Sequence, residues 1–265
     1  MVKKTLLCAA ALFSCAVFAG EIYKAEIRDI YPPKKAEEKD GVFRVAGKAF
    51  FIHSKTAFSV DPAKKYVISG EFRFLGTVPR SFNAGFMPLT SKNQSISSGN
   101  IDAVAGTETV LAAEAKAGDT AIKVADAAKW NNRRAACAVV FDALDNYADF
   151  PNFSCVGMKT GSVKKNGGVW EIELAKPLAK AYAAGTRVRQ HLFGGTFIYS
   201  ISKTRKELSG DWQKFSGTVT GRTGHTRSDK AFWPCTAKVR VIVLASGGSD
   251  DTVLEFRDLK VEEAQ

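Results

Sequence analysis

The residues that could act as metal ligands or catalysts are few and scattered along the chain. The three histidines, His53, His191 and His225, stand far apart, and no His-x-His or His-Glu-x-x-His motif places two of them at zinc-binding spacing. The sequence also contains no Cys-x-x-Cys pair and no Gly-x-Ser-x-Gly nucleophile motif. These patterns give no signature of a zinc site or of a nucleophilic hydrolase.

The segment FDALDNYADFPNF (141–153) comes nearest to a pair of catalytic carboxylates, because it carries Asp142, Asp145 and Asp149. Glycoside hydrolysis needs two carboxyl groups about 5–10 Å apart across a cleft, one of them with a raised pKa. Spacing within a loop establishes neither condition, and a solvated or turn-forming role is favoured. A hydrolase or lyase that uses this loop is therefore the weakest of three functional hypotheses, and we predict no enzyme.

A second chemistry is sugar binding, in which flat aromatic rings stack on the C–H faces of a sugar and polar groups pair with its hydroxyls. The segment AFWPCT (231–236) places Phe232 and Trp233 before a proline in a predicted loop. Trp233 is the predicted stacking platform, and its polar or anion-pairing neighbours precede it in the chain: Arg222, His225 and Arg227. The alternative is that Trp233 packs over the end of a hydrophobic core.

Other aromatic residues are predicted to be structural. Tyr147, Phe150 and Phe153 form a second cluster, which we expect at a contact between two parts of the chain. Trp170 and Trp212 lie in or begin alternating segments, and we expect both to be core residues.

The elements that must position these residues are strands. Five segments alternate apolar and polar residues with a period of two: 65–76, 195–202, 212–221, 237–246 and 252–263. In segment 195–202, this alternation places Phe197, Tyr199 and Ile201 on one face. Segment 237–246 is apolar on nearly both faces, which is typical of a central strand. Frequent Gly, Pro, Asn and Asp residues between the segments favour an all-β sandwich.

The middle of the chain, residues 108–190, is rich in alanine but interrupted by turn signals. Gly118-Asp119 is a turn pair, and Asn166-Gly167-Gly168 is the predicted tip of a hairpin. Further strands are predicted at 121–124, 135–144 and 186–189. We therefore predict a small inserted β module, with one short helix near 126–130 or 178–183; a helical middle domain is the alternative.

Three segments carry a resemblance to a known family: FSVDPAKKYVISGEFRF (58–74), WQKFSGTVTG (212–221) and VRVIVLASGGSDDTVLEFRDLKVEE (239–263). They resemble the jelly-roll carbohydrate-binding modules of the galactose-binding-like superfamily. The resemblance implies a discontinuous jelly-roll sandwich built from residues 20–107 plus 191–265, and glycan binding without cleavage. Residues 108–190 resemble small β modules of bacterial surface and phage-tail proteins, a resemblance that implies no chemistry.

The last predicted strand contains an acid, Asp258, which simple alternation places on the same side as Leu254 and Phe256. In many of these jelly rolls, an acid in the last strand helps to hold a structural Ca²⁺, which prefers six to eight oxygen ligands. The resemblance thus makes Asp258, which matches the second of the family's two acids, a candidate calcium ligand, although Arg257 stands where the first acid would be. The alternative is that Asp258 pairs with a lysine or arginine at the edge of the sandwich.

Residues 1–19 have the pattern of a signal peptide: a basic start, a short apolar run, and small residues at positions −3 and −1, Val17 and Ala19. We expect cleavage before Gly20, with a lipoprotein cleaved before Cys15 as the alternative. The apolar run is too short to span a membrane, and no later run is long enough. A secreted or periplasmic protein, compatible with association to the cell surface, is predicted.

Removal of residues 1–19 takes away two lysines and no acid, so the formal net charge falls from +11 to +9. A basic secreted chain most often meets anionic glycans, anionic lipid headgroups or simply solvent. Nucleic acid is a less favoured partner, because the basic residues are scattered and no helix carries a basic stripe. Of the three remaining cysteines, Cys137 and Cys155 are expected to be buried thiols, with a bridge between them as the alternative. The leading hypothesis is glycan binding; the second is a structural or adhesive component of a cell-surface assembly.

Overall fold

The computed structural model describes residues 18–131, 136–195 and 197–264. Most of the predicted signal peptide, residues 1–17, lies outside the described residues. The described chain is all-β, and its helical content consists of three single 3₁₀ turns: η1 (Ile27–Asp29), η2 (Ser98–Asn100) and η3 (Arg205–Glu207). The predicted all-β class is confirmed, and the helical alternative for the middle of the chain is wrong. The described residues contain no helix of the length and apolarity needed to cross a membrane.

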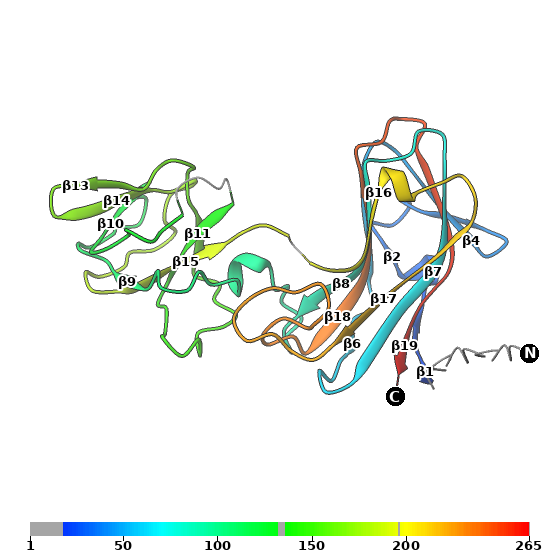
Figure 1. The fold of residues 1–265 in the computed structure, drawn as a ribbon, viewed down its shortest axis with the longest axis horizontal. Coiled ribbons are helices and arrows are strands. Elements are labelled where there is room, and N and C mark those ends of the chain that lie inside the picture. Colours follow the sequence, from blue (N-terminus) through cyan, green and yellow to red (C-terminus); the bar gives the residue numbers. More distant parts are fainter. Residues whose placement is uncertain (1–17, 132–135, 196, 265) are drawn as a thin grey trace, which may run out of the picture.

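Two antiparallel sheets of six strands form a sandwich (Figure 1). Sheet A contains, in spatial order, β17 (Gln213–Thr220), β7 (Lys65–Leu75), β19 (Val253–Ala264), β4 (Val42–Ala46) and β3 (Glu37–Lys39), with β1 (Phe18–Lys24) also paired to β19. Sheet B contains β16 (Ile198–Thr204), β8 (Ser81–Leu89), β18 (Lys238–Ser246), β5 (Phe50–Ser54) and β2 (Ile30–Tyr31), with β6 (Phe58–Ser59) also paired to β18. The longer strands β4, β5, β7 and β8 alternate between the two sheets along the chain, and the short β6, between β5 and β7, stays in sheet B.

The core lies between the inner faces of the two sheets. On β7 the predicted alternation holds, because Tyr66, Ile68, Phe72 and Phe74 are all buried. The Phe72 ring centroid lies 4.9 Å from that of Phe82 on β8, so aromatic rings bridge the two sheets. Strand β18 lies between β8 and β5, and this central position explains why it is apolar on nearly both faces, as predicted.

The middle of the chain forms two smaller antiparallel sheets around a separate core. One contains β12 (Cys155–Gly157), β11 (Cys137–Phe141), β15 (Arg187–Leu192) and β9 (Thr109–Val110), and the other contains β10 (Ala121–Val124), β14 (Val169–Glu173) and β13 (Lys164–Asn166). The hairpin β13–β14 turns at Gly167, whose φ of 61° favours glycine, as the sequence predicts. Segments 126–130 and 178–183 form no helix, and the three cysteines of the described chain form no disulfide.

A β-bulge in β19 explains the acid in the last strand. The register against β7 shifts between Arg257 and Lys260, and Asp258 has a φ of 50° with an exposed side chain. A bulge inserts one extra residue, so the faces exchange beyond it. Leu259 therefore follows Phe256 into the core, and the predicted placement of Asp258 on the apolar face is wrong.

A second bulge, in β16, shifts its register against β8 between Ile198 and Ile201. Both isoleucines are consequently buried in the sandwich core, whereas Phe197 and Tyr199 pack in a separate cluster on the outer face of sheet B. The prediction that grouped Ile201 with these two aromatic residues is wrong. Gly85 of β8 permits the close approach of the two strands at this bulge, because a Cβ atom at position 85 would overlap the carbonyl oxygen of Ile198.

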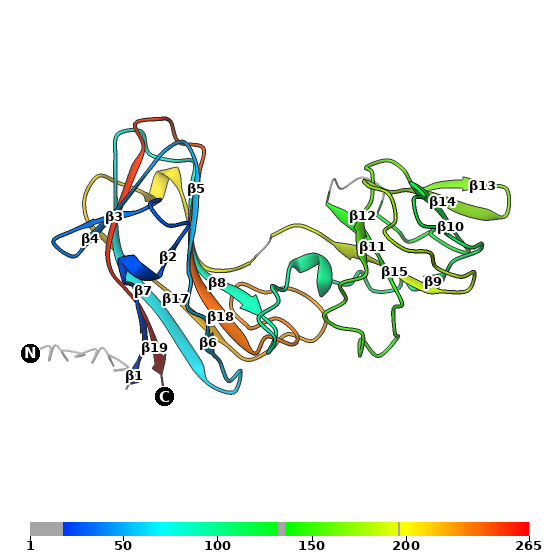
Figure 2. The same ribbon diagram turned by 180° about the vertical axis from the view of Figure 1, so that it is seen from behind.

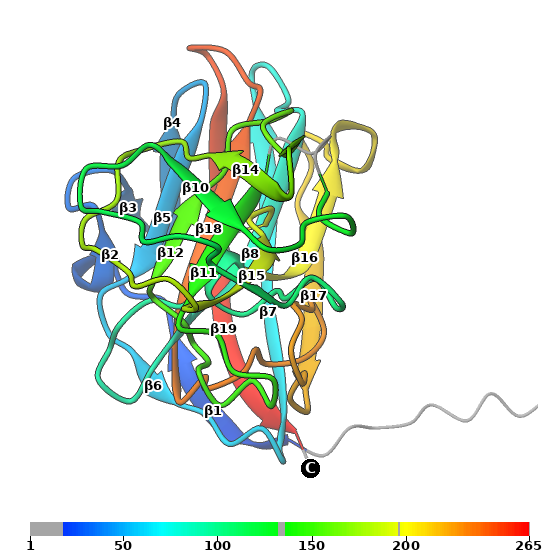
Figure 3. The same cartoon turned by 90° about the vertical axis from the view of Figure 1, so that its left-hand side faces the viewer.

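The chain leaves the sandwich after β8 and returns at β16, two neighbouring strands of sheet B. Figures 1 and 2 show the middle segment on the side of sheet B, and Figure 3 shows β16 and β17 along one edge of the sandwich and β2 and β3 along the other. Strands β9 to β15 pair with one another and not with strands of the sandwich. We call this segment the module; its exact boundaries as a folding unit, 108–190, remain a prediction.

Candidate functional site

The predicted stacking residues are fully buried. Phe232 and Trp233 each have 0% exposure and belong to the sandwich core. Trp233 Nε1 donates a hydrogen bond to the carbonyl oxygen of Ser228 at 2.8 Å, and the Phe232 ring packs against Tyr66 at 5.5 Å. Neither ring has a face open to solvent, so neither can serve as the predicted sugar platform in this structure. Packing over the end of the core, the alternative, is what the structure shows.

The three polar residues predicted beside Trp233 do not converge on one site. Arg222 donates to a backbone carbonyl in its own loop at 3.5 Å. The His225 ring stacks on Tyr147 of the module with a centroid separation of 4.6 Å, and Arg227 forms an ion pair with the buried Asp102 at 3.2 Å. Loop 221–236 thus joins the sandwich to the segment that leads into the module.

A buried polar network centred on Arg189 lies at this joint. The guanidinium group is flanked by the rings of Tyr147 and Phe150, at 4.8 and 5.0 Å from their centroids. Its Nη2 donates to Asp149 Oδ2 and its Nε donates to His191 Nε2, both at 2.9 Å. The predicted contact role is met by Tyr147 and by Phe150, which also packs against the sandwich core, whereas Phe153 is 42% exposed.

His191 is held in its neutral form by this network. Its Nε2 accepts from Arg189, so its proton lies on Nδ1, 2.9 Å from the carbonyl oxygen of Gly99. Burial and then the charge of Arg189 lower the pKa of His191 to about 4. With each polar partner accounted for inside the fold, this network has a structural role.

The three aspartates of the 141–153 segment do not form a catalytic pair. Asp142 forms an ion pair with Lys180 at 3.5 Å, Asp145 pairs with Arg187, and Asp149 belongs to the buried network. Each carboxylate therefore has its own cation partner, on a different residue from the other two. Two carboxyl groups facing each other across a cleft, as glycoside hydrolysis requires, are not found in this loop.

The surroundings of Asp258 do not fit a calcium ion. Asp258 lines a pocket of about 280 Å³ together with two other acids, Glu21 and Glu71, and three lysines, Lys24, Lys214 and Lys260. Glu71 is already paired with Arg257 at 2.6 Å. Three ammonium groups oppose the binding of a divalent cation, which prefers a shell of oxygen ligands. Moreover, nowhere in residues 18–131, 136–195 and 197–264 do three or more His, Cys, Asp or Glu side chains gather in a way that could hold a metal ion.

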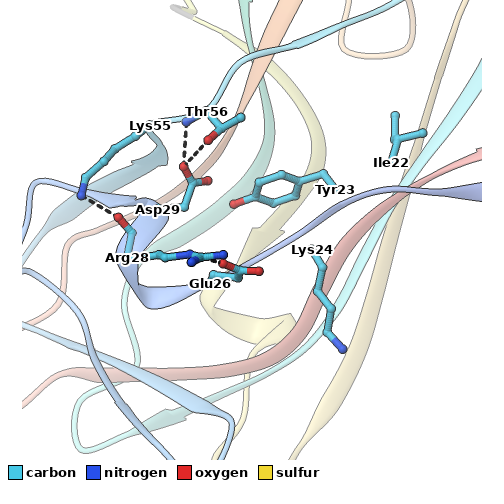
Figure 4. A pocket seen from close by; sticks show the side chains of 8 residues that line it. All are labelled: Ile22, Tyr23, Lys24, Glu26, Arg28, Asp29, Lys55 and Thr56. Atoms are coloured by element: carbon cyan, nitrogen blue, oxygen red, sulfur yellow. Dashed lines mark hydrogen bonds and ion pairs between the residues drawn. The ribbon is translucent and has the colours of Figure 1, made fainter.

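Another pocket, of about 530 Å³, lies where β1 meets η1 (Figure 4). Its polar groups pair with one another: Asp29 Oδ1 accepts from both the backbone N and the Oγ1 of Thr56 at 2.7 Å, and Glu26 pairs with Arg28 at 2.5 Å. The Tyr23 hydroxyl points toward Asp29 (Figure 4), and burial and then the nearby Asp29 carboxylate raise the pKa of Tyr23. The bonds between Thr56 and Asp29 tie η1 to the segment that follows β5.

The outer face of sheet B carries a row of aromatic rings, which we call the aromatic face: Tyr31, His53, Phe51, Phe197 and Tyr199. Successive ring centroids in this order are separated by 4.9, 5.7, 5.4 and 6.3 Å. Tyr31 is 48% exposed and the other four rings are half-buried. The row therefore presents a partly exposed surface of rings in mutual contact.

The strands below explain why this row forms. Phe51 and His53 alternate with the core residues Phe50 and Ile52 on β5, and Tyr31 of β2 lies beside His53 in register. Apolar side chains of the central strands support the rings from beneath and are themselves buried: Met87, Leu89 and Ile242. Such a row of rings rimmed by polar strand residues can stack on the apolar faces of a ligand.

The outer face of sheet A is different. Its aromatic residue, Trp212, is half-buried and stacked by two guanidinium groups, with Arg73 at 4.7 Å and Arg257 at 4.4 Å from the ring centroid. Both arginines are neutralised, Arg73 by Glu255 at 2.7 Å and Arg257 by Glu71 at 2.6 Å. The prediction that Trp212 is a core residue is wrong, because its ring packs on these two ion-paired arginines on the outer face of sheet A.

Sequence reasoning missed the aromatic face because its members come from three distant segments of the chain. One local signal was available: in FFIHS (50–54), two rings alternate with two core residues, so Phe51 and His53 had to face outward. Phe197 lies beside Phe51 only because of the linker that precedes β16 and the bulge within β16, and a period-two pattern indicates neither of them.

No protein-family profile and no curated protein matches the sequence. Among solved structures, the chain is similar to a CBM4 protein, with 12% identity over 87% of this chain and 76% of that one and a TM-score of 0.27. It is also similar to a Bacteroides thetaiotaomicron protein provisionally named sugar-binding, with 8% identity over 86% and 80% of the two chains and a TM-score of 0.24. Because both TM-scores are below 0.5, these similarities carry no inference about a ligand.

Proposed function

We propose that this protein binds a glycan chain along the aromatic face without cleaving it. The observation that carries the proposal is the continuous row of five rings on the outer face of sheet B. Sugars offer C–H faces to such rings and hydroxyl groups to neighbouring polar side chains. On this sheet Asn83 and Ser202, which pair in register on the outer side, are suitable partners for hydroxyl groups.

The absence of cleavage is supported by the charges nearby. The described strands of sheet B contain neither Asp nor Glu, and the aspartates of the 141–153 segment each pair with a cation. A glycosidase needs two carboxyl groups at the bond that it breaks. Incubation with a retained polysaccharide, followed by an assay for new reducing ends and unsaturated products, tests this part; turnover that depends on Asp142 or Asp145 would establish an enzyme instead.

Affinity electrophoresis through gels containing different polysaccharides tests binding. Tyr31→Ala removes the most exposed ring, whose one ring contact is His53, and should spare the fold. Loss of one stacking contact of about 1 kcal/mol should weaken binding roughly fivefold. The matched control is Phe153→Ala, which removes a 42% exposed ring from the module and should leave retardation unchanged. Equal effects of the two changes would contradict the aromatic face as the site.

A second candidate function is a structural or adhesive role in an assembly. The module exposes several large apolar side chains that favour this reading: Val110, Leu144 and Phe153, with Phe193 following its last strand. Sedimentation velocity over a range of concentrations tests it. Self-association that Phe153→Ala abolishes and Tyr31→Ala leaves intact, together with no retardation by any glycan, would favour this function over the first.

A secreted or periplasmic location, with processing before Gly20, belongs to the same proposal. It would place the protein where extracellular glycans occur. N-terminal sequencing of the exported protein tests it, and a first residue other than Gly20 would show that the cleavage site is elsewhere or that Cys15 is the processed residue.

A further inference from the structure

The two sheets of the sandwich differ in charge. None of the described strands of sheet B contains an Asp or a Glu, but these strands hold three cations: Lys203, Lys238 and Arg240. The acids in strands of the sandwich all belong to sheet A: Glu21, Glu37, Glu38, Glu71, Glu255, Asp258, Glu262 and Glu263. Lys203 pairs with Glu207 at 3.0 Å and lies over the core ring of Phe215, so the strands of sheet B offer Lys238 and Arg240, and no carboxylate, to a ligand on the aromatic face. One carboxylate, Asp229 of the 221–236 loop, lies at the end of the row, where it accepts a hydrogen bond from the backbone N of Tyr199 at 3.3 Å.

Arg240 is the basic residue nearest the middle of this face. It lies on the central strand β18 opposite Met87, which supports the aromatic rings, and two residues before Ile242, which pairs with His53. Alternation along β18 turns Arg240 to the same side as Ile242, because the intervening Val241 is buried in the sandwich core.

The Arg240 guanidinium group has no acidic partner among the described residues. Its Nε atom is buried and makes no hydrogen bond. By contrast, Arg73 and Arg257 on sheet A each form an ion pair, and Lys238 donates to Asn93 Oδ1 at 3.1 Å. A buried N–H group without an acceptor is costly, and a planar guanidinium group matches the two oxygens of a carboxylate or sulfate.

We propose that Arg240 pairs with an anionic group of a glycan that lies on the aromatic face, so that the ligand is an acidic polysaccharide. This inference rests on the proposed function and adds the residue that selects for acidic sugars. The anionic group could be the carboxylate of a uronic acid or a sulfate ester, since both offer paired oxygens to the guanidinium fork.

The test measures the binding of the full mature chain to two matched pairs of polymers: polygalacturonate with its methyl ester, and dextran sulfate with dextran. The protein should bind the anionic member of at least one pair about tenfold more tightly, as expected for one charge-assisted pair. Whichever pair shows this difference identifies the anionic group. The Arg240→Gln change should remove the difference without weakening binding to the neutral polymer.

Two further variants separate a specific pair from a general loss of charge. Lys214→Gln removes one positive charge from an exposed position on sheet A and should change affinity less than twofold at 0.15 M salt. Arg240→Lys keeps the positive charge and so controls for an effect of Gln on folding. It should recover only part of the preference for the anionic polymer, because an ammonium group lacks the guanidinium fork.

The outcomes distinguish this inference from the function on which it rests. Equal binding of the charged and neutral polymers, or equal losses in the Arg240→Gln and Lys214→Gln variants, would overturn the role of Arg240 and leave a neutral glycan as the ligand. A preference for acidic polymers that is unaffected by Tyr31→Ala would instead overturn the aromatic face. No binding to any of the four polymers would count against both.

Discussion

Protonation of His191 should destabilise the joint between the module and the sandwich. Burial and the neighbouring Arg189 lower the pKa of His191 from 6.5 to about 4 in the folded protein. The unfolded chain takes up a proton near pH 6.5, whereas the folded chain does so only near pH 4. The stability due to neutral His191 is therefore complete above pH 6.5 and is lost as the pH falls through this window. At about 1.4 kcal/mol per pKa unit, the loss amounts to roughly 3 kcal/mol.

Urea unfolding at several pH values between 4 and 7, in the native protein and in His191→Gln, measures this loss. Glutamine cannot take up the proton, so the variant should lose about 3 kcal/mol less stability over this range than the native protein does. Carboxylates that titrate in the same range contribute equally to both proteins and cancel in the comparison. His53→Gln, which removes a half-buried imidazole from the aromatic face, is the matched control for a His-to-Gln change outside the network.

The reasoning would be refuted if His191→Gln and the native protein lost the same stability between pH 7 and pH 4. Should the variant not fold, an NMR titration of the native protein gives the answer directly. The His191 ring signals should stay at their neutral positions down to about pH 5, and a midpoint near 6.5 would show that the imidazole is not shielded by the network.

Three further predictions concern residues whose sequence context was misleading or ambiguous. Trp233→Ala should lower the free energy of unfolding by about 3–5 kcal/mol, because it empties a fully buried site; a loss below about 1 kcal/mol in chemical denaturation would contradict that burial. Asp258→Gly should raise stability by about 0.5–1 kcal/mol, because glycine adopts the φ of 50° without strain; a lower melting temperature would show that the carboxylate has a stabilising partner. Burial raises the pKa of the Cys155 thiol to about 12, so at pH 8 a thiol reagent should modify the exposed Cys235 at least about tenfold faster, and comparable rates in the single Cys→Ser variants would show that Cys155 is accessible.

The parts of the fold that the sequence predicted are those governed by local periodicity. The 65–76 segment alternates apolar and polar residues, and the 237–246 segment is apolar on nearly both faces. Both patterns predict a strand that packs on a core, and the two segments form β7 and β18. A bulge cannot be predicted in this way, because its one extra residue reverses which side chains of the strand face the core beyond it, and the composition of the strand does not reveal it. Asp258 and Ile201 were both placed on the wrong face for this reason.

Local sequence context was also a poor guide to the predicted stacking residues Phe232 and Trp233, which are buried. Trp233 and its basic neighbours are adjacent in sequence, but adjacency does not tell whether a ring points into the core or into solvent. The aromatic face depends instead on the assembled sheet. Strands β2 and β5 are neighbours at one edge, β16 lies at the other edge beyond β18 and β8, and Phe197, just before β16, brings its ring to 5.4 Å from that of Phe51. Period-two patterns fix which side a residue occupies and not which strands are neighbours.

Strands β1 and β19 are paired, so the first and last described residues emerge side by side from sheet A, the sheet turned away from the module (Figure 1). An affinity tag or a biotin attached at the carboxyl end would anchor every molecule to a sensor surface by the same end of the sandwich, the end at which β1 and β19 meet. Immobilisation through random lysines would lack this orientation, because lysines occur on both sheets. End-tethered protein is therefore the form in which weak, multivalent contacts with a long polymer should be measured.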